Sequence, residues 1–124
     1  MGLPYADETR QHIADIVAEF PEATSTLVVG LHLKLEVRGK TFGWFMEDHH
    51  GDGRLALNFK AYPGVAQAKV AEGGVAHHIP KYVGHRGWLG IWLDSPAVDW
   101  NEVNDLLFDA YALTAPKSLL KTFQ

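Results

Sequence analysis

The sequence contains no cysteine among its 124 residues. Without thiols the protein can form no disulfide, no thiolate metal site and no cysteine nucleophile. Proteins without disulfides are typical of the reducing cytoplasm, so the composition favours that compartment.

Long apolar runs are absent as well. No stretch of the sequence approaches the roughly 20 apolar residues that cross a bilayer. The opening MGLPYADETR has neither the basic nor the apolar region of a secretory signal. We therefore expect a cytoplasmic protein with no membrane segment.

Positive charge is scarce. The sequence has 11 Lys and Arg against 15 Asp and Glu, a net charge of -4. Non-specific affinity for nucleic acid comes mainly from Lys and Arg, which displace counterions from phosphates. A nucleic-acid interface on this protein would therefore have to be local.

Familiar catalytic motifs are also missing. The serines, at positions 25, 95 and 118, lie in no G-x-S-x-G or S-x-x-K pattern. The glycines form neither a Walker loop nor a G-x-G-x-x-G turn after a strand. The sequence thus predicts a non-enzymatic protein with no catalytic residues and no cofactor.

The residues that are present describe an ordinary globular protein. Hydrophobic residues make up 47% of the chain and charged residues 21%, which is typical of a soluble domain. No linker, internal repeat or low-complexity segment divides the chain. We predict a single domain over residues 1–124, either a monomer or a weak homodimer.

Three segments are predicted to be helices. Residues 7–20 carry apolar side chains at i, i+3, i+4 and i+7, and Pro21 ends the pattern. Residues 62–74 begin near a proline and end in two glycines, as a short helix does. The clearest helix begins at Asp99, where a D-x-x-E pattern to Glu102 precedes apolar residues at helical spacing.

Four segments are predicted to be strands. Residues 31–37, LHLKLEV, alternate between apolar and polar side chains, so His32, Lys34 and Glu36 should point outward. A tight connection, RGK, leads into a second strand over residues 41–46, and the two should form a hairpin.

The remaining two strands are expected over residues 54–60 and 88–94. The latter is apolar on both faces, so it should be central or covered on both sides. The predicted order is α-β-β-β-α-β-α. This order favours an α+β two-layer sandwich, with helices on one face of a mostly antiparallel sheet.

The histidines suggest metal binding first. A site would need His49 or His50 to meet His77, His78 or His85 across the fold, with Asp48 or Asp52 completing it. Adjacent histidines on an extended chain point in opposite directions and seldom share one ion. We interpret these histidines as solvent-facing loop residues and predict no metal site.

Basic residues near aromatic ones suggest two kinds of binding surface. A nucleic-acid interface would place phosphates on the cations of the hairpin and of the segment before the last strand: Arg38, Lys40, Lys81, His85 and Arg86. A pocket for a small anionic ligand or a protein segment would instead be enclosed by Trp44, Tyr82, His85, Arg86 and Trp88. Spacing alone favours the tryptophans as core residues and leaves residues 82–87 as the functional segment.

Three stretches together resemble the MmcQ/YjbR family of small bacterial proteins. They are VRGKTFGWF at residues 37–45, YVGHRGWLGIWLD at 82–94 and VNDLLFDAYALTAPKSL at 103–119. The form PKYVGHRGW is similar to the actinobacterial-type branch of the family.

The resemblance implies a frataxin-like α+β fold, also described as a double wing. It also implies DNA binding, the label that members of the family commonly carry, and it supplies no catalytic residues. Because frataxins bind iron through an acidic first helix, the likeness of fold makes the ridge of Asp7, Asp15 and Glu19 a lesser candidate for divalent metal.

Overall fold

The computed structural model describes residues 3–29, 31–81 and 83–121. Within this part of the chain, six strands form one sheet in the order β1-β2-β3-β4-β6-β5, and every neighbouring pair is antiparallel. The strands are β1 (Ala23–Val28), β2 (His32–Val37), β3 (Lys40–Glu47), β4 (Leu55–Phe59), β5 (His77–His78) and β6 (Leu89–Trp92). The predicted α+β class is therefore confirmed.

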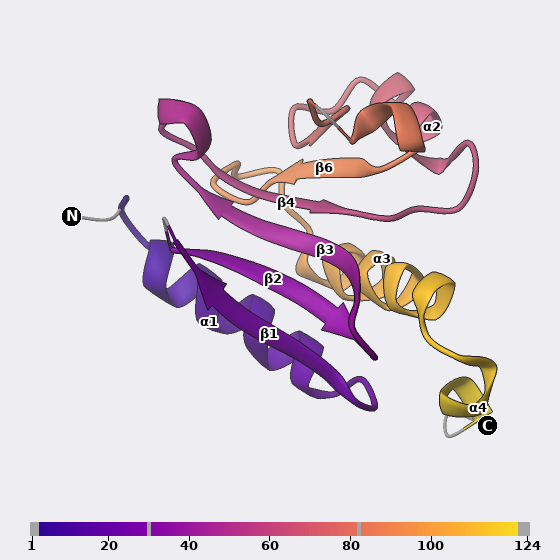
Figure 1. The fold of residues 1–124 in the computed structure, drawn as a ribbon. Helices are drawn as coiled ribbons and strands as arrows, with labels where there is room; N and C mark the ends of the chain where they lie inside the picture. The colour runs from indigo at the N-terminus through magenta and orange to yellow at the C-terminus, as the bar shows by residue number, and fades with distance from the viewer. Residues whose placement is uncertain (1–2, 30, 82, 122–124) are drawn as a thin grey trace.

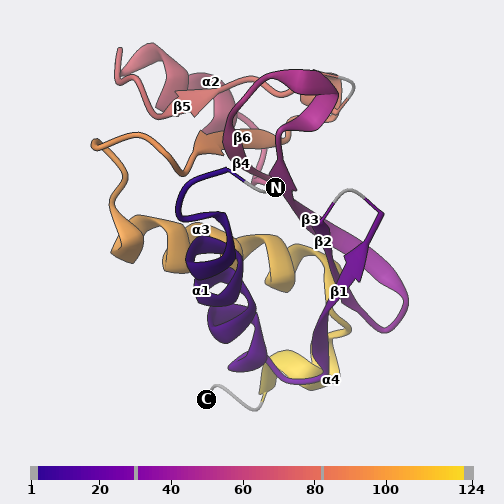
Figure 2. The same ribbon diagram turned by 90° about the vertical axis from the view of Figure 1, so that its left-hand side faces the viewer.

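Helices cover one face of this sheet. The long helices α1 (Ala6–Ala18) and α3 (Trp100–Thr114) lie together behind the sheet in Figure 1 and beside it in Figure 2. The shorter helices are α2 (Val65–Ala71) and α4 (Lys117–Leu120), and the 3-10 turns are η1 (His49–Gly51) and η2 (Gly84–Arg86). The arrangement confirms the predicted two-layer sandwich. No helix among the described residues is long and apolar enough to cross a membrane.

Two strands were not predicted from the sequence. β1 lies at the sheet edge, and its side chains are all at least partly exposed, so it lacks the alternation of a half-buried strand. β5 has two residues, too few for any periodicity. The predicted element order was therefore wrong in lacking these two strands and the four-residue helix α4 (Lys117–Leu120).

The core lies between the sheet and the two long helices. Leu35, Phe45 and Leu57 of the sheet are fully buried against residues such as Ile13 of α1 and Leu107 of α3. Each such side chain stabilises the fold by roughly 1.5–3 kcal/mol relative to an exposed one. The apolar alternation of β2 is confirmed, because Leu33, Leu35 and Val37 are buried.

Helix α3 is held at its start by the predicted cap. Asp99 Oδ1 accepts hydrogen bonds from the backbone N–H groups of Asn101 (2.9 Å) and Glu102 (3.3 Å). The Glu102 side chain does not return to the cap. It binds Lys69 Nζ of α2 at 2.9 Å and His77 Nε2 of β5 at 2.7 Å, so one carboxylate joins three elements.

Replacing Asp99 tests the cap. We expect Asp99→Ala to lower the free energy of unfolding by about 1 kcal/mol, because two helix N–H groups lose their acceptor. For a domain of this size the melting temperature should fall by roughly 4 °C, measured by circular dichroism. Asp99→Ser keeps an acceptor oxygen and should melt close to the wild type. An Ala variant as stable as the Ser variant would contradict the cap's contribution.

Candidate functional site

The sheet face opposite α1 and α3, here called the helix-free face, carries rows of side chains set by strand register. Trp44 pairs with Asn58, Asn58 with Gly90, and Gly90 with His78. In the next row Met46 pairs with Ala56, and Ala56 with Trp92. Successive residues of a strand alternate between faces, so these two rows occupy the same side of the sheet.

A cavity of about 480 Å³ lies over these rows. The sheet provides its floor, while η1 and the segment after β5 add further walls. Its lining residues are Trp44, Met46, His49, Asp52, Ala56, Asn58, His78, Ile79, Pro80, Lys81, Val83 and Trp92. A volume of this size, with mostly apolar walls and a few polar groups, is typical of sites that bind small molecules.

Trp92 is held in place by stacking. The His78 ring lies parallel to it, with 3.9 Å between ring centroids and 16° between planes. The Arg54 guanidinium lies 4.2 Å from the Trp92 ring centroid and is itself paired with Asp94 at 2.8 Å. The indole is therefore a fixed wall of the cavity.

Gly90 allows His78 to take this position. A Cβ atom at residue 90 would lie 2.3 Å from His78 Nε2, well inside contact distance. A side chain there would push the imidazole off the sheet, so the glycine is needed for the close approach of β5 to β6.

Two buried polar atoms of this face lack a hydrogen-bond partner among the described residues: Asn58 Oδ1 and His78 Nδ1. Asn58 is 8% exposed, and its Nδ2 donates to Met46 Sδ at 3.9 Å. Sulfur is a weak acceptor. The amide therefore stands at the floor of the cavity with much of its hydrogen-bonding capacity unused.

His78 is uncharged near neutral pH. Burial lowers its pKa to about 4, and the cation of Arg54 acts in the same direction. The floor of the cavity, formed by Asn58, His78 and apolar side chains, thus carries no formal charge.

The described residues that the sequence predicts to enclose one pocket do not all line the same cavity in the structure. Trp44 lines the cavity, and so does Lys81, which had been assigned to the nucleic-acid interface. Trp88 is 5% exposed and is not among the lining residues. His85 and Arg86 are exposed in η2, also outside the lining. Tyr82 lies outside the described residues.

The two groups of predicted nucleic-acid cations lie beside strands that are not neighbours in the sheet. Arg38 and Lys40 form the β2–β3 turn, whereas Arg86 precedes β6, and β4 lies between β3 and β6 in the sheet. Arg38 is already paired, since its Nε and Nη2 atoms donate to Glu22 at 2.5 and 2.8 Å. These bonds lower the pKa of the Glu22 carboxyl.

The described histidine side chains do not gather into a metal site. His77 binds Glu102 on the helix side while His78 stacks on Trp92 on the helix-free face, as expected for neighbours on an extended strand. His49 and Asp52 line the cavity with His78. Nowhere in the described chain do three or more His, Asp or Glu side chains stand close enough to bind one metal ion.

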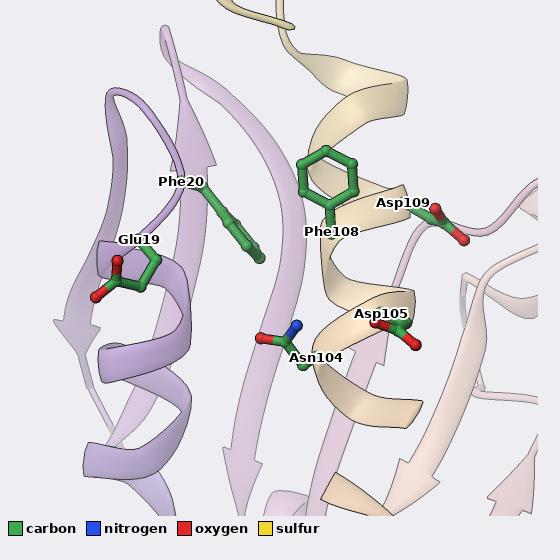
Figure 3. Close-up of a pocket in the computed structure, with 6 residues that line it drawn as sticks. All are labelled: Glu19, Phe20, Asn104, Asp105, Phe108 and Asp109. Atoms are coloured by element: carbon green, nitrogen blue, oxygen red, sulfur yellow. The ribbon is translucent and has the colours of Figure 1, made fainter. Parts of the chain in front are cut away.

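The acidic ridge of the first helix is divided among separate partners. Asp15 accepts a hydrogen bond from Gln11 at 2.8 Å. Glu19 lines a separate cavity of about 520 Å³ between α1 and α3, where Phe20 faces Phe108, as Figure 3 shows. Asp105 and Asp109 of α3 line it too, and burial, followed by the Asp105 charge, raises the pKa of Asp109.

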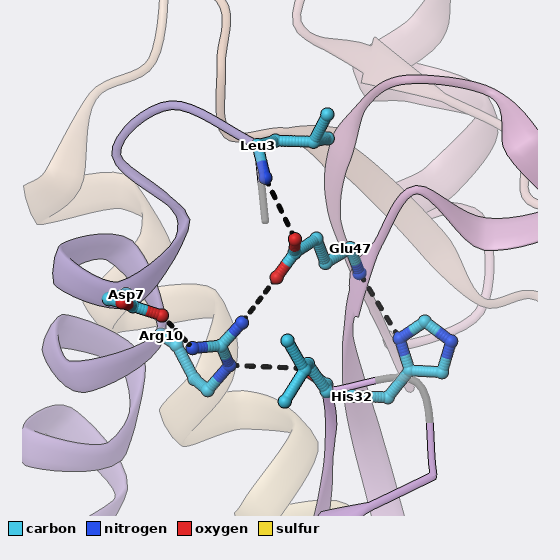
Figure 4. Close-up of polar contacts among 6 residues, drawn as sticks. Leu3, Asp7, Arg10, His32 and Glu47 are labelled. Carbon is cyan, nitrogen blue, oxygen red and sulfur yellow. Dashed lines mark hydrogen bonds and ion pairs between the residues drawn. The ribbon is translucent and has the colours of Figure 1, made fainter. Parts of the chain in front are cut away.

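Asp7 belongs to a polar network that fastens α1 to the sheet (Figure 4). Arg10 pairs with Asp7 at 2.7 Å and with Glu47, whose carboxylate is buried at the end of β3. The other Glu47 oxygen accepts the Leu3 N–H at 2.9 Å, and His32 Nδ1 accepts the Glu47 N–H at 3.1 Å. Asp7 is thus exposed and paired with Arg10 at the surface, whereas the buried Glu47 makes the contact that links α1 to the sheet.

Several site residues were not predicted from the sequence, chiefly Asn58, His78 and Trp92. One signal was available. The predicted strand over residues 88–94 was recognised as apolar on both faces, which implies a covered second face. Which side chains cover that face depends on the pairing of β5, a strand too short to predict.

A family model named YjbR matches residues 18–113, more than half of the chain. The chain belongs to the YjbR family. The resemblance seen in the sequence is thereby confirmed at the level of the family. No curated protein matches the sequence significantly. The YjbR match includes every described lining residue of the cavity, since these lie between Trp44 and Trp92.

The lowered pKa of His78 predicts a pH-dependent stability. The unfolded chain binds a proton near pH 6.5 and the folded chain near pH 4, so stability is complete above 6.5 and decreases as the pH falls toward 4. We expect a loss on the order of 1–2 kcal/mol, reduced from the full shift because the ring is partly exposed. Urea unfolding at a series of pH values measures it.

The control is His78→Phe, which keeps a ring on Trp92 but cannot be protonated. Its stability should change less between pH 6.5 and 4, with a remainder from His32, whose pKa burial also lowers. An unchanged slope in this variant would show that His78 is not responsible.

Proposed function

We propose that this protein is a non-enzymatic binding module that holds a small organic ligand in the cavity of the helix-free face. The observation that carries the proposal is the cavity itself, about 480 Å³ in volume and walled by Trp44 and Trp92 on the face that the long helices leave uncovered. The Trp44 indole offers a flat ligand a large apolar contact at low entropic cost, and Trp92, whose ring is covered by His78 and Arg54, adds its edge.

The polar groups at the cavity suit recognition better than covalent chemistry. The described lining residues include no serine, threonine or cysteine to act as a nucleophile. Lys81 lies in the lining and is positioned to meet an anionic group of the ligand. We therefore propose that the ligand is anionic, one of the alternatives that the sequence suggested. We also propose that the protein is cytoplasmic.

A fluorescent anion tests this function. Anilinonaphthalene sulfonate combines a flat apolar body with one negative charge, and we expect it to bind with increased emission. Trp44→Ala removes a wall and should weaken binding about tenfold, as the loss of roughly 1.4 kcal/mol would. Trp100→Ala is the matched control, because Trp100 stacks on His12 at the helix side, 3.9 Å between centroids. If both variants bind the probe with equal affinity, the probe binds outside this cavity, which would contradict the proposal.

Nucleic-acid binding is a second candidate, favoured by the cations beside the cavity. Lys81 and Arg86 are exposed, and among the described residues neither forms an ion pair. Such cations are available to phosphates, whereas the Arg38 guanidinium is occupied by Glu22.

A salt titration of labelled single-stranded and duplex DNA tests this candidate. Phosphate contacts require the logarithm of the association constant to fall linearly with the logarithm of salt, by about 0.9 per contact on duplex DNA. Lys81→Glu with Arg86→Glu should abolish binding, and Arg38→Glu should change the slope less. Wild-type protein that fails to bind at low salt, or a double variant that binds normally, would rule the interface out.

A further inference from the structure

We propose that the ligand of this cavity carries an amide-like edge, an N–H donor next to an acceptor, which pairs with the side chain of Asn58. This inference rests on the proposed ligand-binding function and names the chemical class that the site selects.

Asn58 is the buried polar residue of the cavity floor. It is 8% exposed, yet its Oδ1 has no hydrogen-bond partner among the described residues. A buried acceptor left unpaired destabilises a protein by roughly 1–3 kcal/mol. Buried polar groups in native proteins are almost always paired, so this exception calls for a partner from outside the chain.

The neighbours of Asn58 supply no strong hydrogen-bond partner. In the sheet it lies between Trp44 on β3 and Gly90 on β6, and the His78 ring lies over Gly90. Its Nδ2 reaches only the weak acceptor Met46 Sδ, at 3.9 Å. Among the described residues, both ends of the amide therefore lack a strong hydrogen-bond partner.

A primary amide offers one acceptor and one donor side by side in a plane. Its complement is an edge that presents a donor beside an acceptor, as a lactam or an aminopurine does. The indoles of Trp44 and Trp92 in the same lining favour a flat ring as the bearer of that edge. The uncharged floor favours a neutral edge, and Lys81 can meet a charge carried elsewhere on the ligand.

The proposal predicts opposite effects of one substitution on stability and on binding. Asn58→Leu replaces the amide by an apolar side chain of similar size, so the unpaired acceptor disappears. We expect the melting temperature to stay equal or rise by a few degrees. A purely structural asparagine would instead lower it when replaced.

Binding is measured with two probes of matched shape, isoquinolone and isoquinoline, by the quenching of tryptophan fluorescence. Both have two fused rings, but only isoquinolone presents an N–H beside a carbonyl. We expect the wild type to bind isoquinolone about tenfold more tightly, the value of one well-formed polar pair. Asn58→Leu should bind both probes equally, and Trp44→Ala should weaken both.

The outcomes separate this inference from the proposed function. Equal affinity of the two probes for the wild type would overturn the amide-edge inference and leave the cavity as a ligand site. The same holds if neither ring binds while anilinonaphthalene sulfonate does. Failure of all three probes would overturn both proposals. A preference for isoquinolone that survives in Asn58→Leu would assign the selection to another residue and overturn the role of Asn58.

Discussion

The structure depends on one constraint: its central strands β4 and β6 are buried on both faces, while the long helices cover one of them. All five residues of β4 are buried, and three of the four residues of β6 are too. A sheet exposed on its second face would leave these strands in water. The helix-free face is covered only by short segments, η1 and the chain after β5. Because these segments do not fill the space over the sheet, a cavity remains between them and the strands.

That cover is held in place from the opposite side of the sheet. Glu102 of α3 binds His77, and the next residue, His78, must then face the other way and lie on Trp92. Lys69 of α2 binds the same carboxylate, so α2, β5 and α3 are fixed relative to one another. A carboxylate on the helix side thereby positions a wall of the cavity, although it lies outside the lining.

The sequence predicted most of the fold because the fold follows from periodicity. The apolar spacing of α1, the cap of α3 and the alternation of β2 are local patterns, and each is present in the structure. The cavity could not be predicted in the same way. Asn58 reads as an ordinary outward-facing residue of a strand until β6 and β5 are paired beside it, and those pairings join residues far apart in the chain. The family match does not say which residues pair across the sheet. The site could therefore be recognised only in the three-dimensional structure.

Charged residues are distributed differently on the two sides of the sheet. The acidic residues Glu19, Asp105 and Asp109 line the cavity between α1 and α3, on the helix side. Lys81 lies on the other side, in the lining of the cavity. In a protein of net charge -4, an anionic ligand is repelled over much of the surface. In the cavity Lys81 would attract the proposed ligand, and the Asp52 carboxylate of the same lining limits how close to it a negative charge can lie.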